Sequence, residues 1–181
     1  MTLPSKQNAL ILLIAFFTMT LFSCKKDSTP ANATGNSAIV TGSYGFDGAA
    51  GTAFYSSKAG IIQTTVAGIT SFSISAVRDG GNESITIIGF QNITGPTTIN
   101  FSSSLNNGGT TISKNYNMAA DQTINYTTDN NGSAGALGGA QLKVVSYDGT
   151  NIEGTFYAVA YNNSGRVAFV EQGTFKGKVT R

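Results

Sequence analysis

The 181-residue chain has no histidine, no tryptophan and one cysteine, and only 11% of its residues are charged. Without histidine it cannot form a Ser-His-Asp or Cys-His catalytic site, nor a zinc or iron site that uses imidazole ligands. Eleven Lys and Arg against nine Asp and Glu give a formal charge of +2, too weak and too scattered for a nucleic-acid-binding surface. These absences exclude most enzyme classes and predict no nucleic-acid partner.

The one long apolar run covers Ala9 to Phe22 and is followed by Lys25 and Lys26. Its 14 residues, at ~1.5 Å each, span roughly 21 Å, short of the ~30 Å core that a transmembrane helix crosses. By the positive-inside rule, a retained helix followed by these lysines would hold the main domain in the cytoplasm. The run therefore predicts a secretory signal peptide over residues 1–23, which is removed by cleavage.

The residues at the end of this run, Leu21-Phe22-Ser23-Cys24, resemble a bacterial lipobox, in which a leucine and a small residue precede an obligatory cysteine. The resemblance implies that Cys24 becomes the lipidated N-terminus of the mature protein. Two or three acyl chains bind a membrane far more firmly than a single chain does. A general secretory signal with an incidental cysteine is the alternative. Because Cys24 is the only cysteine, the lipidated protein has no disulfide and no free thiol.

Residues 24–38 combine this cysteine with a stretch rich in Ser, Thr, Asn, Ala and Lys, a composition that cannot bury a core. We interpret the segment as a flexible tether. Within it, Lys25-Lys26-Asp27 resembles the charged tags that direct some Bacteroidetes lipoproteins to the cell surface. Asp27-Ser28-Thr29 resembles the O-glycosylation motif of those bacteria, which makes Ser28 and Thr29 candidate glycosylation sites. A chance match in a chain rich in Ser and Thr is the alternative.

Residues 39–181 show a period of two, and none of their segments has the three-and-four apolar spacing of a helix. In Ile69–Val77, for example, Phe72, Ile74 and Ala76 alternate with serines, which is typical of a half-buried strand. Further strands are predicted at Glu83–Phe90, Thr97–Ser102, Thr110–Met118 and Gln122–Thr128. Short strands separated by turns rich in Gly and Asn predict a single all-β domain, an antiparallel β-sandwich or a β-barrel.

The C-terminal part of the chain predicts an antiparallel meander of three strands, Ala140–Tyr147, Ile152–Tyr161 and Arg166–Val179. Alternation places Phe156 and Phe169 in the core. It turns Tyr157 and Tyr161 to the opposite face. With Tyr147 of the neighbouring strand, these tyrosines form a candidate ligand face, because tyrosine rings stack on sugars and pack in protein interfaces. The alternative is that a second sheet covers this face.

Carboxylates offer the remaining chemistry. Asp148 and Glu153 flank one predicted turn and are the nearest candidates for the acid pair that glycoside hydrolysis requires. The alternative, which we favour, is that Asp148 only shapes the turn. The oxygen-rich stretch Asp129–Ser133 lacks the repeated acids and the distal Glu of a calcium loop, so a plain turn is favoured there too. The sequence thus predicts no catalytic residue, no metal site and no cofactor.

Several features follow one another in a recognisable order. They are the lipobox, the tether, an opening strand Gly51–Tyr55, paired strands from Phe72 to Phe101, and Ile152–Phe156 with Gly173–Phe175. Together they resemble the small Bacteroidetes lipoproteins that carry a β-rich domain of unknown function. The resemblance implies a β-domain that a lipid anchor holds outside the cytoplasm, on the outer membrane. With the missing catalytic groups, it leads us to expect a non-enzymatic binding or structural module whose partner is a glycan or an envelope protein. A carbohydrate-active enzyme that uses only carboxylates is the alternative.

Overall fold

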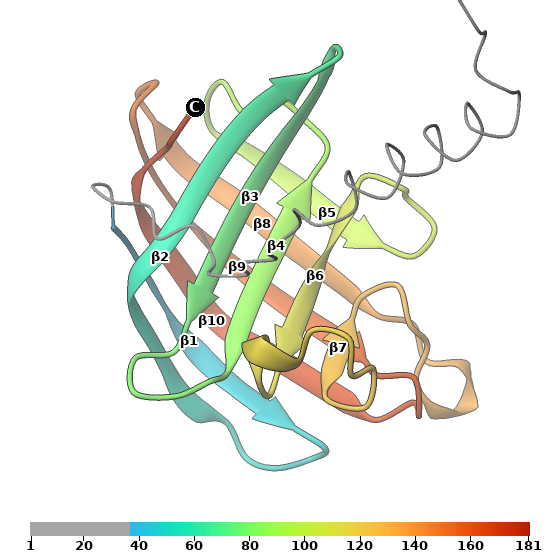
Figure 1. Ribbon diagram of the computed structural model, residues 1–181. Coiled ribbons are helices and arrows are strands. Elements are labelled where there is room, and N and C mark those ends of the chain that lie inside the picture. Colours follow the sequence, from blue (N-terminus) through green and yellow to red (C-terminus); the bar gives the residue numbers. More distant parts are fainter. Residues whose placement is uncertain (1–36) are drawn as a thin grey trace, which may run out of the picture. The chain divides into compact units, whose positions relative to one another are not determined.

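The computed structural model describes residues 37–181, which form an all-β domain of ten strands in antiparallel pairs (Figure 1). The strands are β1 (Ala38–Phe46), β2 (Thr52–Val66), β3 (Ile69–Val77), β4 (Ser84–Gly89), β5 (Thr97–Ser102), β6 (Gly108–Ser113), β7 (Asn125–Thr127), β8 (Gly139–Tyr147), β9 (Asn151–Tyr161) and β10 (Val167–Lys178). The only helical segments of residues 37–181 are two short 3-10 turns, η2 (Tyr116–Met118) and η3 (Ser133–Gly135), and neither could span a bilayer. The predicted fold class is confirmed.

Eight of these ten strands form a closed barrel. In order around the ring they are β10, β1, β2, β3, β4, β6, β7 and β9, and β9 pairs again with β10. The seam between β7 and β9 is one residue pair, Thr127 with Tyr161. Closing a sheet into a ring removes the free strand edges that an open sheet exposes. Of the two predicted architectures, the domain therefore has the barrel.

Strands β8 and β5 extend the wall beside this seam. β8 pairs with β9 on the edge that also meets β7, and β5 pairs with β8. Phe101 and Ile99 of β5 point inward, because a Cβ at Gly89 of β4 would lie 3.5 Å from the Phe101 ring and 3.7 Å from Ile99. The expectation of paired strands from Phe72 to Phe101 is therefore wrong at β5, which pairs with a distant strand. A period of two predicts which face is buried, but it does not specify the partner strand.

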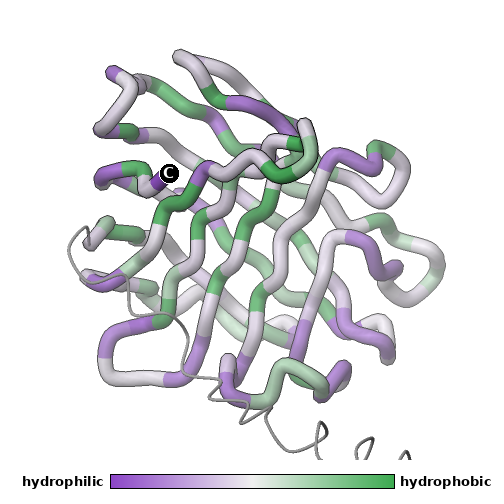
Figure 2. The backbone as a smooth tube through the Cα atoms, turned by 45° about the horizontal axis from the view of Figure 1, so that its top comes forward, coloured by the Kyte–Doolittle hydropathy of each residue, from purple (hydrophilic) through white to green (hydrophobic). Residues whose placement is uncertain are grey.

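The inward-facing side chains of residues 37–181 form an apolar core inside the barrel. In β3 the three apolar residues of Phe72–Ala76 are buried and the serines face outward, as predicted. In β9 Phe156 is buried and Tyr157 is exposed, which confirms the predicted alternation. Gly154 leaves room for the Phe175 ring, which a Cβ at that position would meet at 2.5 Å. Figure 2 shows hydrophobic and hydrophilic positions alternating along the strands.

The prediction that Phe169 belongs to the core is wrong. Ala168 and Val170 of β10 face the interior, and Phe169 lies half-buried on the outer face. A β-bulge between Val170 and Gly173 inserts one extra residue into β10, with Gln172 at a φ of 52°. Such a bulge reverses which residues of a strand face inward, so an alternation of buried and exposed residues that is correct after the bulge is wrong before it.

The two ends of the barrel differ in composition. We call the end with the β2–β3 turn, the β8–β9 turn and the start of β1 the upper end, as drawn in Figure 1. The opposite, lower end has the loops 47–51, 78–83, 114–124 and 162–166. The segments 59–77 and 84–113 contain no charged residue, so the charges of β2 to β6 and their loops lie at Lys58 and in loop 78–83.

Candidate functional site

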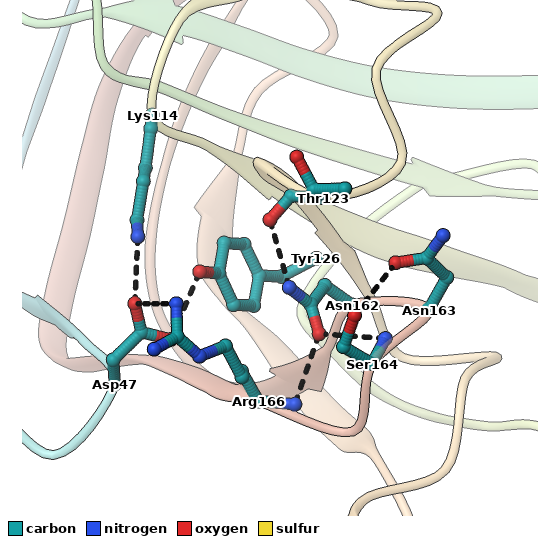
Figure 3. A network of polar contacts seen from close by, with 8 residues as sticks. All are labelled: Asp47, Lys114, Thr123, Tyr126, Asn162, Asn163, Ser164 and Arg166. Atoms are coloured by element: carbon teal, nitrogen blue, oxygen red, sulfur yellow. Dashed lines mark hydrogen bonds and ion pairs between the residues drawn. The ribbon is translucent and has the colours of Figure 1, made fainter.

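A cluster of polar contacts lies at the lower end of the barrel (Figure 3). Asp47 follows β1 and accepts hydrogen bonds from the Lys114 ammonium at 2.6 Å and from the Tyr126 hydroxyl at 3.0 Å. The Arg166 guanidinium lies 3.6 Å from the same carboxylate. Lys114 Nζ also lies 5.3 Å from the ring centre of Phe46, which is within the range of a cation–π contact. The cluster thus ties together the ends of β1, β6, β7 and β10.

The contacts of this cluster stabilise the ionised forms of Asp47 and Lys114. Burial raises the pKa of Asp47, but the hydrogen bonds from Lys114 and Tyr126 and the nearby positive charges outweigh burial, so this pKa is lowered. Burial lowers the pKa of Lys114, but its contacts with Asp47 and Tyr126 outweigh burial, so this pKa is raised. Burial raises the pKa of Tyr126, so its hydroxyl stays protonated and donates to Asp47. A proton-transfer group needs a pKa near the working pH, so this arrangement suits a structural role.

Asn162 orders the loop that places Arg166 in the cluster. Its amide donates to the Thr123 carbonyl at 2.7 Å, and its side-chain oxygen accepts from the backbone N–H groups of Ser164 at 3.0 Å and Arg166 at 2.9 Å. Sequence reasoning identified this segment as a turn and missed the cluster, because the paired charges Asp47 and Lys114 are 67 residues apart.

A groove of about 500 Å³ lies on the outer wall over β4, β6 and β7. We call it the hydroxyl groove, and its lining includes Thr86, Ile88, Phe90, Thr111, Thr127 and Asp129. Phe90 is 56% exposed and Ile88 40% exposed, so the groove offers apolar surface to solvent. Ile88 faces outward because it follows the inward-facing Ile87 in β4. Gly108 of β6, opposite Gly89, has a φ of 119°, which only glycine adopts readily, and a Cβ there would clash with the Ile88 carbonyl oxygen, so glycine lets β6 lie close to β4 at the groove.

A row of hydroxyl side chains crosses this groove. The strand register places Thr86 opposite Thr111 and Thr111 opposite Thr127. The row continues to Ser75 of β3 on one side and to Tyr161 of β9 on the other. Neighbouring strands lie ~4.8 Å apart, so the hydroxyl-bearing residues repeat at about that spacing. Each hydroxyl can both donate and accept a hydrogen bond.

The structure brings together two of the three tyrosines of the predicted ligand face. Tyr157, which is 51% exposed, and Tyr161, which is half-buried, share the outer face of β9. Tyr147 instead lies opposite Ile152 and packs against the core. The reason is a β-bulge that follows Val144 and reverses the alternation of β8 before Tyr147. Ligand binding by Tyr147, Tyr157 and Tyr161 remains a prediction.

The carboxylates Asp148 and Glu153 line a second groove, of about 440 Å³, at the upper end. Asp148 accepts hydrogen bonds from the backbone N–H groups of Thr150 at 2.8 Å and Asn151 at 2.6 Å. The Asn151 side chain and these N–H groups lower the pKa of Asp148 to about 2. Glu153 forms an ion pair with Lys176 at 3.3 Å. This geometry supports the interpretation of Asp148 as a residue that shapes the turn.

The predicted signal peptide, Cys24, Ser28 and Thr29 lie outside residues 37–181 and remain predictions. Among the residues that the structure describes, no three Cys, Asp or Glu side chains gather so that they could hold a metal ion. Asp129 of the predicted turn lines the hydroxyl groove. Comparison of the chain with family models, with curated proteins and with solved structures gives no match.

Proposed function

We propose that this protein is a lipid-anchored, non-enzymatic binding module of the cell envelope and that its hydroxyl groove binds a neutral glycan. Cys24 carries the anchor, which holds the domain outside the cytoplasm on the outer membrane. The observation that carries the binding proposal is the row of Thr86, Thr111 and Thr127 beside the exposed ring of Phe90.

Neutral sugars match this surface chemically. Sugar hydroxyls donate and accept hydrogen bonds, as threonine hydroxyls do. The apolar C–H faces of sugar rings pack on exposed apolar side chains, and Phe90 with Ile88 supplies such a surface. Asp129, the one carboxylate of the lining, can accept hydrogen bonds from sugar hydroxyls. Residues 84–113, which supply most of the lining, carry no charge that would attract a charged ligand.

The ionisation of the carboxyl groups favours binding over carboxylate catalysis. Glycoside hydrolysis needs one carboxylic acid that is still protonated near neutral pH, which requires a raised pKa. Within residues 37–181, a group of carboxyls has a lowered pKa instead: Asp47, Asp79, Glu83, Asp121 and Asp148. Each of them is stabilised as a carboxylate and is therefore a poor proton donor.

The proposed anchor leaves the groove accessible. The domain begins at the upper end with Ala38, 14 residues after Cys24. At ~3.5 Å per residue, a tether of this length reaches at most about 49 Å. The hydroxyl groove lies on the side wall of the barrel, so it can face a glycan chain while the upper end faces the membrane.

Glycan binding can be tested with the mature lipoprotein in detergent micelles and immobilised neutral polysaccharides. Phe90→Ala and Thr111→Val should each weaken binding, by about three- to tenfold, because each removes one contact of the groove. Tyr55→Ala is the matched control, since it removes a similarly exposed aromatic ring on β2, outside the groove, and should bind like the wild type. Equal binding by all three variants, or no binding of any neutral polysaccharide, would refute the proposal.

The anchor is tested separately by metabolic labelling with a fatty-acid probe. The wild-type protein should incorporate the label, and Cys24→Ala should not, because Cys24 is the only thiol in the chain. Label that persists in Cys24→Ala would contradict lipidation at this residue.

A further inference from the structure

The β2–β3 hairpin projects beyond the upper end of the barrel (Figure 1). β1 begins with Ala38 opposite Ala59 of β2, and β4 ends with Gly89 opposite Phe72 of β3. Beyond Ala59 of β2 and Phe72 of β3, in residues 64–71, the two strands pair only with each other. At ~3.3 Å per residue, the hairpin turn lies about 23 Å along β2 from the level of Ala38. The turn is thus an outlying point of the upper end.

The tip of this hairpin is apolar and exposed. Val66 and Ile69 lie directly opposite each other and are 69% and 67% exposed. Between them, Ala67 and Gly68 form the turn, with φ values of 51° and 83°, as in the tight turns that match the twist of a hairpin. Residues 59–77 contain no charged residue, so the tip carries no charge that would hold it in water. Val66 and Ile69 together give the tip a small continuous apolar surface.

We propose that the tip, Val66 to Ile69, inserts into the interfacial region of the membrane that carries the protein, an inference that rests on the proposed lipid anchor. The chain that follows Cys24 enters the domain at Ala38, so the proposed anchor is attached to the domain at the upper end, where the tip also lies. Shallow insertion among headgroups and the first methylenes suits a short apolar surface without charge. Two side chains bind a membrane only weakly, but the anchor keeps them close to it, so the contact forms within one molecule.

The distribution of charge supports this orientation. The charged residues near the upper end are Lys58 of β2 beside the start of β1, and Asp148, Glu153, Lys176, Lys178 and Arg181 from the β8–β9 turn and the end of the chain. They leave residues 59–77, the outer part of the hairpin, as the uncharged part of that end. The lower end carries the Asp47–Lys114 and Arg78–Glu83 ion pairs, whose transfer from water into lipid is costly. The lower end therefore faces away from the membrane.

The chain has no tryptophan, so the fluorescence of a single introduced tryptophan comes from one known position and makes this orientation measurable. The experiment uses the full lipidated protein with Ile69→Trp, reconstituted into phosphatidylethanolamine and phosphatidylglycerol vesicles with and without brominated acyl chains. Met118→Trp is the matched control, since Met118 is 48% exposed in η2 at the lower end. We expect a blue shift and bromine quenching for Ile69→Trp and neither change for Met118→Trp. Circular dichroism of both variants confirms that they fold.

The outcomes separate the inference from the proposed function. If the protein floats with the vesicles but Ile69→Trp emits as in water, the tip does not touch lipid and the inference fails while the anchor stands. If the emission is blue-shifted without bromine quenching, a second copy or another protein covers the tip, and lipid docking is overturned. If the protein does not float with the vesicles, the anchor fails and the inference fails with it.

Discussion

Phe156 and Tyr157 are neighbours in β9 that should respond very differently to truncation. Phe156 is buried, and its ring lies so close to Gly173 that a Cβ there would approach it to 2.7 Å. Burial of such a side chain contributes ~1.5–3 kcal/mol, and a residual cavity on the order of 80 Å³ adds about 2 kcal/mol at ~24 cal/mol per Å³. Phe156→Ala should therefore lower the free energy of unfolding by about 4 kcal/mol, or the melting temperature by roughly 8–16 °C.

Tyr157 is half exposed and lies opposite Gln141 of β8. Tyr157→Ala removes a cross-strand contact on the outer face, worth ~0.2–1 kcal/mol, so the melting temperature should fall by less than about 4 °C. Thermal unfolding followed by circular dichroism, with urea titrations as a second measure, distinguishes the two variants. Equal destabilisation by both substitutions would show that both faces of β9 are buried, and it would refute the placement of Tyr157 on the outer surface.

Two further predictions concern the charges and the bulge. The lowered pKa of Asp47 means that its carboxylate stabilises the folded state fully above pH ~3.9, and that this contribution is lost as the pH falls below that value. Asp47→Asn should therefore be less stable than the wild type above pH ~3.9, and the urea midpoints of the two proteins should converge in acid. A difference in midpoint that stays constant with pH would contradict the ion pair. Gln172→Gly should raise the melting temperature slightly, because Gln172 has a φ of 52° and glycine relieves a left-handed penalty of ~1–2 kcal/mol, whereas Glu171→Gly, the matched control, should lower it.

The alternation of apolar and polar residues was sufficient to predict strands wherever the strand pairing is regular. The bounds of β3 and β5 agree with the predicted Ile69–Val77 and Thr97–Ser102. The predicted strand Thr110–Met118 instead ends at Ser113, because η2 begins after Asn115, whose side chain accepts a hydrogen bond from the N–H of Asn117. Strand β1 and most of β2 were not predicted, since a register shift and several Gly and Ser residues obscure their period.

The candidate site was less accessible to sequence reasoning. Thr86, Thr111 and Thr127 each occupy an ordinary outward position, and only the register of three strands aligns them. The wrong predictions for Phe169 and Tyr147 have a common cause. In each strand a β-bulge lies between this residue and the residues from which the buried face was inferred. A bulge needs only one extra residue, and no residue type marks it reliably. Registers and bulges are properties of strand pairs, so a single strand does not encode them.

The pairing of β1 with β10 determines when this barrel can fold. Thr41 and Thr174 form a hydrogen bond of 2.7 Å across that pair, although 133 residues separate them along the chain. The ring therefore cannot close until the last strand has left the ribosome or a translocation channel. Contacts between such distant residues form slowly compared with local hairpins. Until then the apolar faces of the early strands stay uncovered, which makes the growing chain prone to aggregation.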